Sequence, residues 1–135
     1  MKYRFLIYGL LGWTMEIFWT GLGSLLRGDF RLQGFSYLWM FPIYGLAVFL
    51  EPVHDHIRNL TWVIRGSIWT TVIFGIELIT GLAIELTVGK VPWDYTGSSY
   101  YSIAGLIRLD YAPVWFVVGL LFEKVDDFMR TKIHL

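Results

Sequence analysis

Long apolar stretches separated by short polar segments predict four helices that cross a membrane. A spanning helix needs about 20 mainly apolar residues, because the hydrocarbon core of a bilayer is roughly 30 Å thick. Four stretches meet or approach this length. The chain is therefore expected to be an all-α membrane protein with four transmembrane helices in a bundle, and the expected spans are Tyr3–Leu26, Phe35–Asp55, Trp62–Val88 and Tyr111–Met129.

One further apolar segment, Tyr100–Leu109, precedes the last expected span and is too short to cross a bilayer. We expect a short interfacial or re-entrant helix there. Pro42 and Pro113 lie near the starts of their helices or act as kinks, which membrane helices tolerate. Together these elements predict a single integral membrane domain over residues 1–135.

The composition supports a membrane protein and excludes several classes of function. The chain is 56% hydrophobic and only 16% charged, whereas soluble domains carry about 25% charged residues. Its formal net charge is zero and it has no basic stripe, so no nucleic-acid partner is expected. It lacks cysteine and a phosphate-binding glycine-rich loop. We therefore expect no thiolate metal site, no ATPase activity of the chain itself and no cofactor.

The distribution of basic residues predicts that both termini lie in the cytoplasm, most simply at the cell membrane. Cytoplasmic loops carry an excess of Lys and Arg. Seven of the eleven basic residues fall on the side of the termini, and the four on the other side are Arg27, Arg31, Lys90 and Arg108.

The two halves of the chain resemble each other weakly. Segments 7–16 and 68–77 are similar and each ends in a glutamate, and segments 50–55 and 122–127 are similar as well. This pattern predicts a tandem two-helix repeat, although apolar segments also resemble each other by chance. A repeated two-helix unit keeps its orientation, so an axis along the membrane normal would relate the halves.

Two carboxylates near the centres of long apolar stretches, Glu16 and Glu77, are the most informative polar residues. An ionised side chain at the bilayer centre costs at least about 2.5–3.5 kcal/mol, so such residues are rare and usually functional. Glu16 shares a helix face with small residues and Trp13, at spacings of three and four. We expect this face to meet the face around Glu77, which would place both carboxylates inside the bundle.

No basic residue is expected at the depth of these two glutamates, which leaves three states for them. Each can hold a proton, accept hydrogen bonds from neutral donors, or bind a cationic ligand. These states predict proton coupling or recognition of a small cationic or amphipathic molecule. The alternative is structural, with two protonated and hydrogen-bonded glutamates that fix the register of the helices.

Polar residues at the expected cytoplasmic helix ends predict a structural ion cluster. Glu51, Arg65 and Glu123 lie near such ends, and Arg65 can pair with either glutamate. His54 and His56 are two residues apart, so they point to different sides of a helix and no metal site is expected.

At the opposite side of the membrane, Trp93, Asp94 and Tyr95 are candidates for an outer mouth. Trp and Tyr favour the membrane interface, so the segment is either an anchor or a lining. With Glu85 nearby, Asp94 and Tyr95 are also candidates for general acid–base chemistry if the protein is an enzyme acting on a lipid or isoprenoid head group. The sequence supplies no nucleophile–base pair for such an enzyme.

Several motifs resemble one family of small membrane proteins over nearly the whole chain. In order they are segments 12–16 (GWTME), 41–45 (FPIYG), 75–77 (GIE), 92–95 (PWDY) and 113–115 (PVW). Their order and spacing resemble the putative ABC-transporter type IV, or CmpB-like, family.

The resemblance implies a permease-like integral membrane component and draws attention to the motif positions. The expected binding or proton-coupling residues are Glu16, Glu77, Trp93, Asp94, Tyr95, Trp13 and Tyr44. A four-helix bundle has a small interior, so we expect a homodimer in the lipid bilayer. The alternatives to transport are the membrane enzyme and a non-catalytic accessory subunit of a larger membrane complex.

Overall fold

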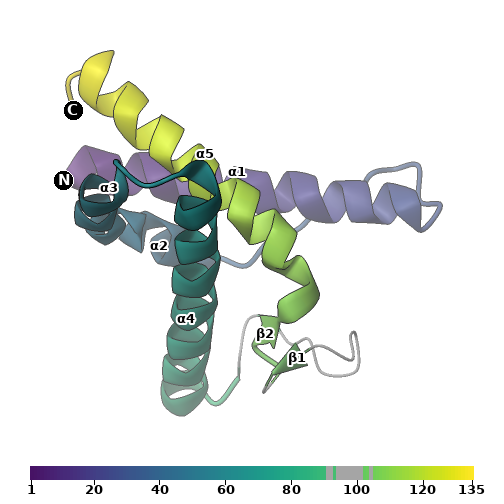
Figure 1. Ribbon diagram of the computed structural model, residues 1–135. Coiled ribbons are helices and arrows are strands. Elements are labelled where there is room, and N and C mark those ends of the chain that lie inside the picture. Colours follow the sequence, from purple (N-terminus) through teal and green to yellow (C-terminus); the bar gives the residue numbers. More distant parts are fainter. Residues whose placement is uncertain (91–92, 94–101, 104) are drawn as a thin grey trace. The chain divides into compact units, whose positions relative to one another are not determined.

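The computed structural model describes residues 1–90, 93, 102–103 and 105–135 (Figure 1). The chain forms two compact units, residues 1–52 with Leu135, and residues 53–134. Each unit contains one of the two longest helices and is described by itself. The described residues form an all-α structure with one small hairpin.

The first unit is built on the long helix α1 (Lys2–Leu26). After α1 the chain runs without regular helix to residue 39. It then stays helical through α2 (Met40–Gly45), the 3₁₀ segment η1 (Leu46–Leu50) and α3 (Glu51–Ile57). From Val53 onward, α3 belongs to the second unit.

The second unit is built on the long helix α4 (Trp62–Val88). Two short antiparallel strands follow, β1 (Ser102–Ile103) and β2 (Ile107–Arg108), and then the 3₁₀ turn η2 (Leu109–Tyr111). The last helix, α5 (Ala112–Thr131), packs against α4 and crosses it obliquely (Figure 1).

Two helices, α1 and α4, are long and apolar enough to cross a bilayer. Their bounds confirm the first and third expected helices to within one residue. Helix α5 closely matches the fourth expected helix, but several charged residues in its second half make it less apolar. Within the described part of the chain, only α1 and α4 therefore qualify as spans by length and composition.

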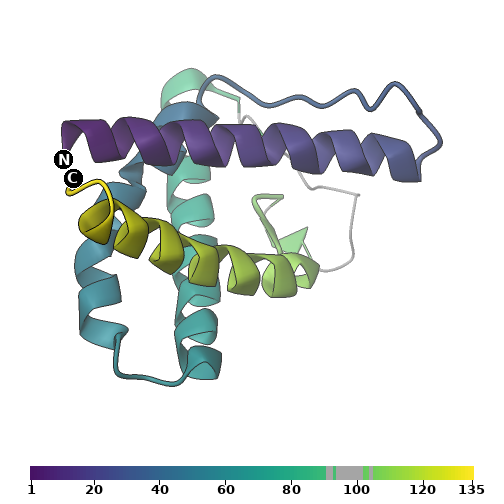
Figure 2. The same cartoon turned by 90° about the horizontal axis from the view of Figure 1, so that it is seen from above.

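The second expected span, Phe35–Asp55, is wrong in its first residues. The segment before α2 is not helical and runs back along α1 (Figure 2). The hydroxyl of Thr20 on α1 accepts from the Phe35 backbone N–H at 2.7 Å and donates to the Phe35 carbonyl at 2.9 Å. Gly34 lies directly against the backbone of Ile17, where a larger residue would not fit. These tertiary contacts replace the local hydrogen bonds of a helix.

The interfacial helix expected over Tyr100–Leu109 is also wrong where this segment is described. Ile103 and Ile107 lie opposite each other in the hairpin, and Gly105 between them has a φ of 69°. Glycine adopts that left-handed conformation without steric cost, which allows the tight turn. Short apolar runs do not distinguish a strand from a helix, and this ambiguity explains the error.

The two units make the same contacts at equivalent positions. The long helices correspond at an offset of 61 residues, and the segments after them at 71 or 72. In one unit the ring of Phe5 lies over Gly45, and in the other the ring of Phe116 lies over Gly66, so the large and small residues have exchanged helices. The contact between Gly9 and Phe41 in the first unit corresponds to the contact between Thr70 and Ala112 in the second. The contact between Thr20 and Phe35 corresponds in the same way to the contact between Gly81 and Leu106.

The 3₁₀ segment η1 explains why the offset changes from 71 to 72. Glu51 follows Gly45 by one residue fewer than Glu123 follows Phe116. Five residues at about 3.0 per turn advance by about 600°, whereas five residues at about 3.6 per turn advance by about 500°. The extra rotation of η1 equals about one α-helical residue, so Glu51 returns to the helix face that Glu123 occupies.

Gly119 and Gly75 offer a matched test of the packing between α4 and α5. A side chain at position 119 would collide with the buried Trp69, whereas one at position 75 meets nothing within 4 Å. Gly119→Ala is expected to destabilise the protein by about 1–3 kcal/mol through overpacking. Gly75→Ala should leave stability unchanged or raise it, because alanine is the better helix former. Melting temperatures in detergent, followed by tryptophan fluorescence, check this; equal values would contradict the packing.

Candidate functional site

The first unit surrounds Glu16 with neutral polar groups. Glu16 lies half-buried near the middle of α1, and Tyr44 from α2 hydrogen-bonds its carboxylate. The Tyr44 ring crosses α1 at Gly12, one turn before Glu16, where any side chain would block it. Ser36, in the segment before α2, lies near the same carboxylate. Glycine at position 12 therefore allows Tyr44 to reach the glutamate.

Three buried polar atoms of this unit lack a hydrogen-bond partner among the described residues. They are Oε2 of Glu16, the hydroxyl oxygen of Ser36 and the indole Nε1 of Trp13. Trp13 packs edge-on against Phe41, with ring centroids 6.0 Å apart. Buried polar groups are normally satisfied, so each such exception calls for an explanation such as a water, ion or ligand. The structure thus brings together Trp13, Glu16 and Tyr44, which the sequence had singled out.

The second unit places Glu77 at the equivalent position of α4. Its Oε2 atom is buried, and the side chain as a whole is half-buried. Trp115 of α5 occupies the position that Tyr44 has in the first unit, and its buried Nε1 finds no acceptor among the described residues. Glu16 and Glu77 belong to different units, so their pairing stays a prediction.

Each unit has a glutamate clamp, defined as a glutamate of the second helical segment held by an arginine and an aromatic residue of the long helix. In the first clamp Arg4 donates to Glu51 at 2.7 Å and Tyr8 at 3.0 Å. In the second clamp Glu123 accepts from Arg65 at 3.0 Å and from Trp69 at 2.8 Å. Arg65 therefore pairs with Glu123, one of its two expected partners, and Glu51 has an arginine of its own.

The expected outer mouth is described only in part. Asp94 and Tyr95 lie outside the described residues. Trp93 is half-buried, and its Nε1 donates to the carbonyl of Leu106 at 3.1 Å. Leu106 in turn fills the space over Gly81 of α4. Trp93 thus ties the hairpin segment to the far end of α4.

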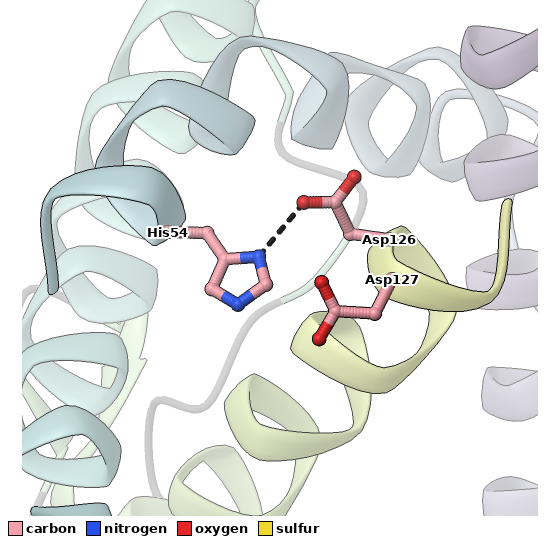
Figure 3. Close-up of side chains that lie close together, drawn as sticks. All are labelled: His54, Asp126 and Asp127. Atoms are coloured by element: carbon pink, nitrogen blue, oxygen red, sulfur yellow. Dashed lines mark hydrogen bonds and ion pairs between the residues drawn. The ribbon is translucent and has the colours of Figure 1, made fainter. Parts of the chain in front are cut away.

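An ion network between α3 and α5 forms a second polar centre, which the sequence reasoning missed. Nδ1 of His54 on α3 lies 2.7 Å from Oδ2 of Asp126 on α5, and both side chains are almost fully buried (Figure 3). Asp127, the next residue on α5, points its carboxylate towards the same imidazole (Figure 3). The network extends to two arginines and one further aspartate.

The two arginines of the network each join two carboxylates. Arg58 donates to Asp55 at 3.1 Å and to Asp127 at 2.8 Å, and Arg130 donates to Asp126 at 2.8 Å and to Asp55 at 2.9 Å. Arg58, followed by Arg130, holds the pKa of the exposed Asp55 carboxyl below its ordinary value. Asp127 in turn raises the pKa of Arg58.

His54, Asp126 and Asp127 could also be read as a metal site. Their candidate ligand atoms all lie within 4.8 Å of one another. Both carboxylates, however, already accept from guanidinium groups, which supply positive charge and occupy one oxygen of each. A divalent ion would have to overcome the repulsion of both arginines. The arrangement is better suited to joining two helices than to binding a cation.

A signal for this network was present in the sequence. Segments 51–58 and 123–130 share a glutamate, then an aspartate four residues later, then an arginine three residues after that. Facing helices with the same pattern can exchange ion pairs, as α3 and α5 do. Treating the histidines of α3 as a possible site on one helix concealed their partner on the other.

Comparison with known proteins agrees with the motifs in the sequence. A family model described as "Putative ABC-transporter type IV" matches residues 3–134, which is almost the whole chain. The match confirms the resemblance and includes Glu16 and Glu77, both clamps and the ion network. No solved structure matches the chain.

Neighbouring aspartates test the ion network. Asp126→Asn removes the charge between His54 and Arg130 in a buried position, and it is expected to cost about 3 kcal/mol of stability. Asp127→Asn alters a partly exposed ion pair, so its cost should stay below about 1 kcal/mol. Chemical unfolding in mild detergent measures both. A cost for Asp127→Asn as large as that for Asp126→Asn would contradict the difference in burial.

Metal titration distinguishes an ion network from a metal site. Because Arg58 and Arg130 already occupy the carboxylates, we expect Zn²⁺, Mn²⁺ and Ca²⁺ to leave the melting temperature of the purified protein unchanged. A rise that depends on metal concentration and disappears in His54→Ala would show that the site binds metal.

Proposed function

Because the chain belongs to the putative ABC-transporter type IV family of integral membrane proteins, we propose that it is a small transport or ligand-binding protein whose intramembrane glutamates couple to protons. Glu16 is the central residue of this proposal. It exchanges a proton with the aqueous phase or with a small cationic or amphipathic molecule. The mechanism rests on the polar groups around Glu16 in the first unit.

The single observation that carries the proposal is a pair of neighbouring buried oxygens, each without a partner among the described residues. They are Oε2 of Glu16 and the hydroxyl oxygen of Ser36. One hydrogen bond between the two side chains satisfies both atoms in either charge state, because a serine hydroxyl accepts from a neutral carboxyl group and donates to a carboxylate. A proton removes the charge, whose burial in a bilayer is costly. Loss of the proton leaves a carboxylate that attracts a cation.

The equivalent contacts of the two units support a tandem repeat as the architecture of this protein. Glu16 and Glu77 are then equivalent residues at one depth of the membrane, and both clamps lie at the cytoplasmic side. In this arrangement both termini are cytoplasmic, in keeping with the excess of Lys and Arg there. A homodimer would supply the larger interior that transport requires.

The outer segment with Trp93, Asp94 and Tyr95 completes the proposal as a lining or gate at the opposite side. Trp93 holds the hairpin segment near the end of α4 through its bond to Leu106. An accessory role in a larger complex remains as the outcome if the isolated protein moves no ligand.

Glu16→Gln tests proton coupling, with Glu85→Gln as its control. Glu85 is an exposed glutamate near the end of α4, so its replacement keeps the change in charge but avoids the site. Protein in vesicles with a pH-sensitive dye inside is given ethylammonium or tetraphenylphosphonium outside. We expect the wild type and Glu85→Gln to exchange protons for one of these cations, and Glu16→Gln to lose the exchange. Ser36→Ala should weaken it, because the proton loses its acceptor.

Two results would contradict this function. The first is an exchange rate in Glu16→Gln equal to that of the wild type. The second is no exchange by any variant together with stable co-purification of a larger membrane protein, which would favour the accessory role.

A further inference from the structure

We propose that the extended segment 33–37 lines a water-filled vestibule that opens on the side of Arg27 and leads to Glu16. The ligand of this site is then a proton or a small hydrated cation, and not an amphipathic molecule that enters from the lipid. The inference rests on the proposed role of Glu16 and adds the route and the class of ligand.

The depth of the segment follows from its contacts with α1. Counted from Arg4 in the first clamp, Glu16, Thr20 and Ser24 lie at about 18, 24 and 30 Å along a helix that rises about 1.5 Å per residue. The Ser24 hydroxyl donates to the carbonyl of Gln33 at 2.7 Å, and Thr20 exchanges two bonds with Phe35. The extended segment therefore descends along α1 from its far end.

At Ser36 the extended segment reaches the middle of the membrane. It lies beside Glu16, about 12 Å below the level of Ser24 by the same helix rise. The three residues from Gln33 to Ser36 span about 10 Å when extended, at about 3.3 Å per residue. The two estimates agree, so non-helical backbone reaches roughly half the thickness of the hydrocarbon core.

Backbone in that position has polar groups that lipid cannot satisfy. Within the described chain, the N–H groups of Gln33, Gly34 and Ser36 donate to no protein oxygen. Irregular backbone at membrane depth is tolerated only where protein buries it or where it lines a water-filled cavity. Thr20 and Ser24 satisfy part of the segment, and water is the simplest partner for the rest.

The buried atoms at the lower end of the segment point to the same conclusion. Glu16, Ser36 and Trp13 each present a polar atom without a partner among the described residues. One atom is an N–H donor, one is a carboxylate acceptor, and the hydroxyl can act as either. A water molecule or a small hydrated cation with its waters matches this mixture. An apolar tail would leave all three unsatisfied.

Single cysteines test the vestibule, because the chain has no cysteine of its own. Tyr37→Cys places a thiol on the segment, and Phe18→Cys places one on α1 at a depth between Glu16 and Thr20; both aromatic side chains are exposed, at 42% and 69%. The probe is the charged, membrane-impermeant reagent MTSET, added to the side that carries Arg27. Since the thiolate is the reactive form and needs water, we expect Tyr37→Cys to react at least about tenfold faster than Phe18→Cys.

A second cysteine variant tests whether the vestibule reaches the glutamate. Ser36→Cys should also react faster than Phe18→Cys, and N-ethylmaleimide after denaturation confirms that every thiol is present. Equal rates at positions 37 and 18 would overturn the vestibule. Reaction at 37 without reaction at 36, or reaction only from the side of the termini, would overturn the route to Glu16. Fast labelling at positions 36 and 37, together with proton–cation exchange that Glu16→Gln does not change, would support the vestibule and contradict the proposed function.

Discussion

The constraint on which this structure depends is that polar groups within long apolar segments need partners from the protein or from water, because lipid supplies none. At the helix ends the constraint is met with charge, because Arg4 holds Glu51 and Arg65 holds Glu123. Near the middle of α1 the described polar neighbours of Glu16 are neutral. Arg4 lies about 18 Å away along the helix and cannot help. This difference separates glutamates that join helices through ion pairs from a glutamate with neutral neighbours.

The sequence predicted those features of the structure that depend on local properties of the chain. The bounds of α1 and α4 follow from the length and apolarity of their stretches, and a single arginine near two glutamates was enough to predict a partner of Arg65. The non-helical backbone around Phe35 depends instead on Thr20, fifteen residues earlier, and on the close approach of Gly34 to α1. Helix propensity and hydrophobic periodicity contain no information about such tertiary contacts. The apolar stretch was therefore predicted to be helical from Phe35 onward.

The ion network shows a different limit of sequence reasoning. His54 was judged by its neighbours on α3, although its partner Asp126 lies 72 residues later in the chain. The shared pattern of segments 51–58 and 123–130 contained that information, because equivalent positions of two similar helices meet each other. Arg58 and Arg130 are such a pair, and each bonds carboxylates on both helices. Comparing the halves of a chain can thus reveal contacts that neither half shows alone.

The same comparison shows that the surroundings of Glu16 and Glu77 differ. The contacts that hold each unit together are kept with exchanged residues, as at Phe5–Gly45 and Gly66–Phe116. The groups near the glutamates have diverged further, since the position of Ser36 is taken by the buried Ile107 in the second unit. Isoleucine has no polar side-chain atom, so position 107 offers no counterpart of the Ser36 hydroxyl. The packing of the two units is therefore equivalent, while the polar surroundings of Glu16 and Glu77 differ.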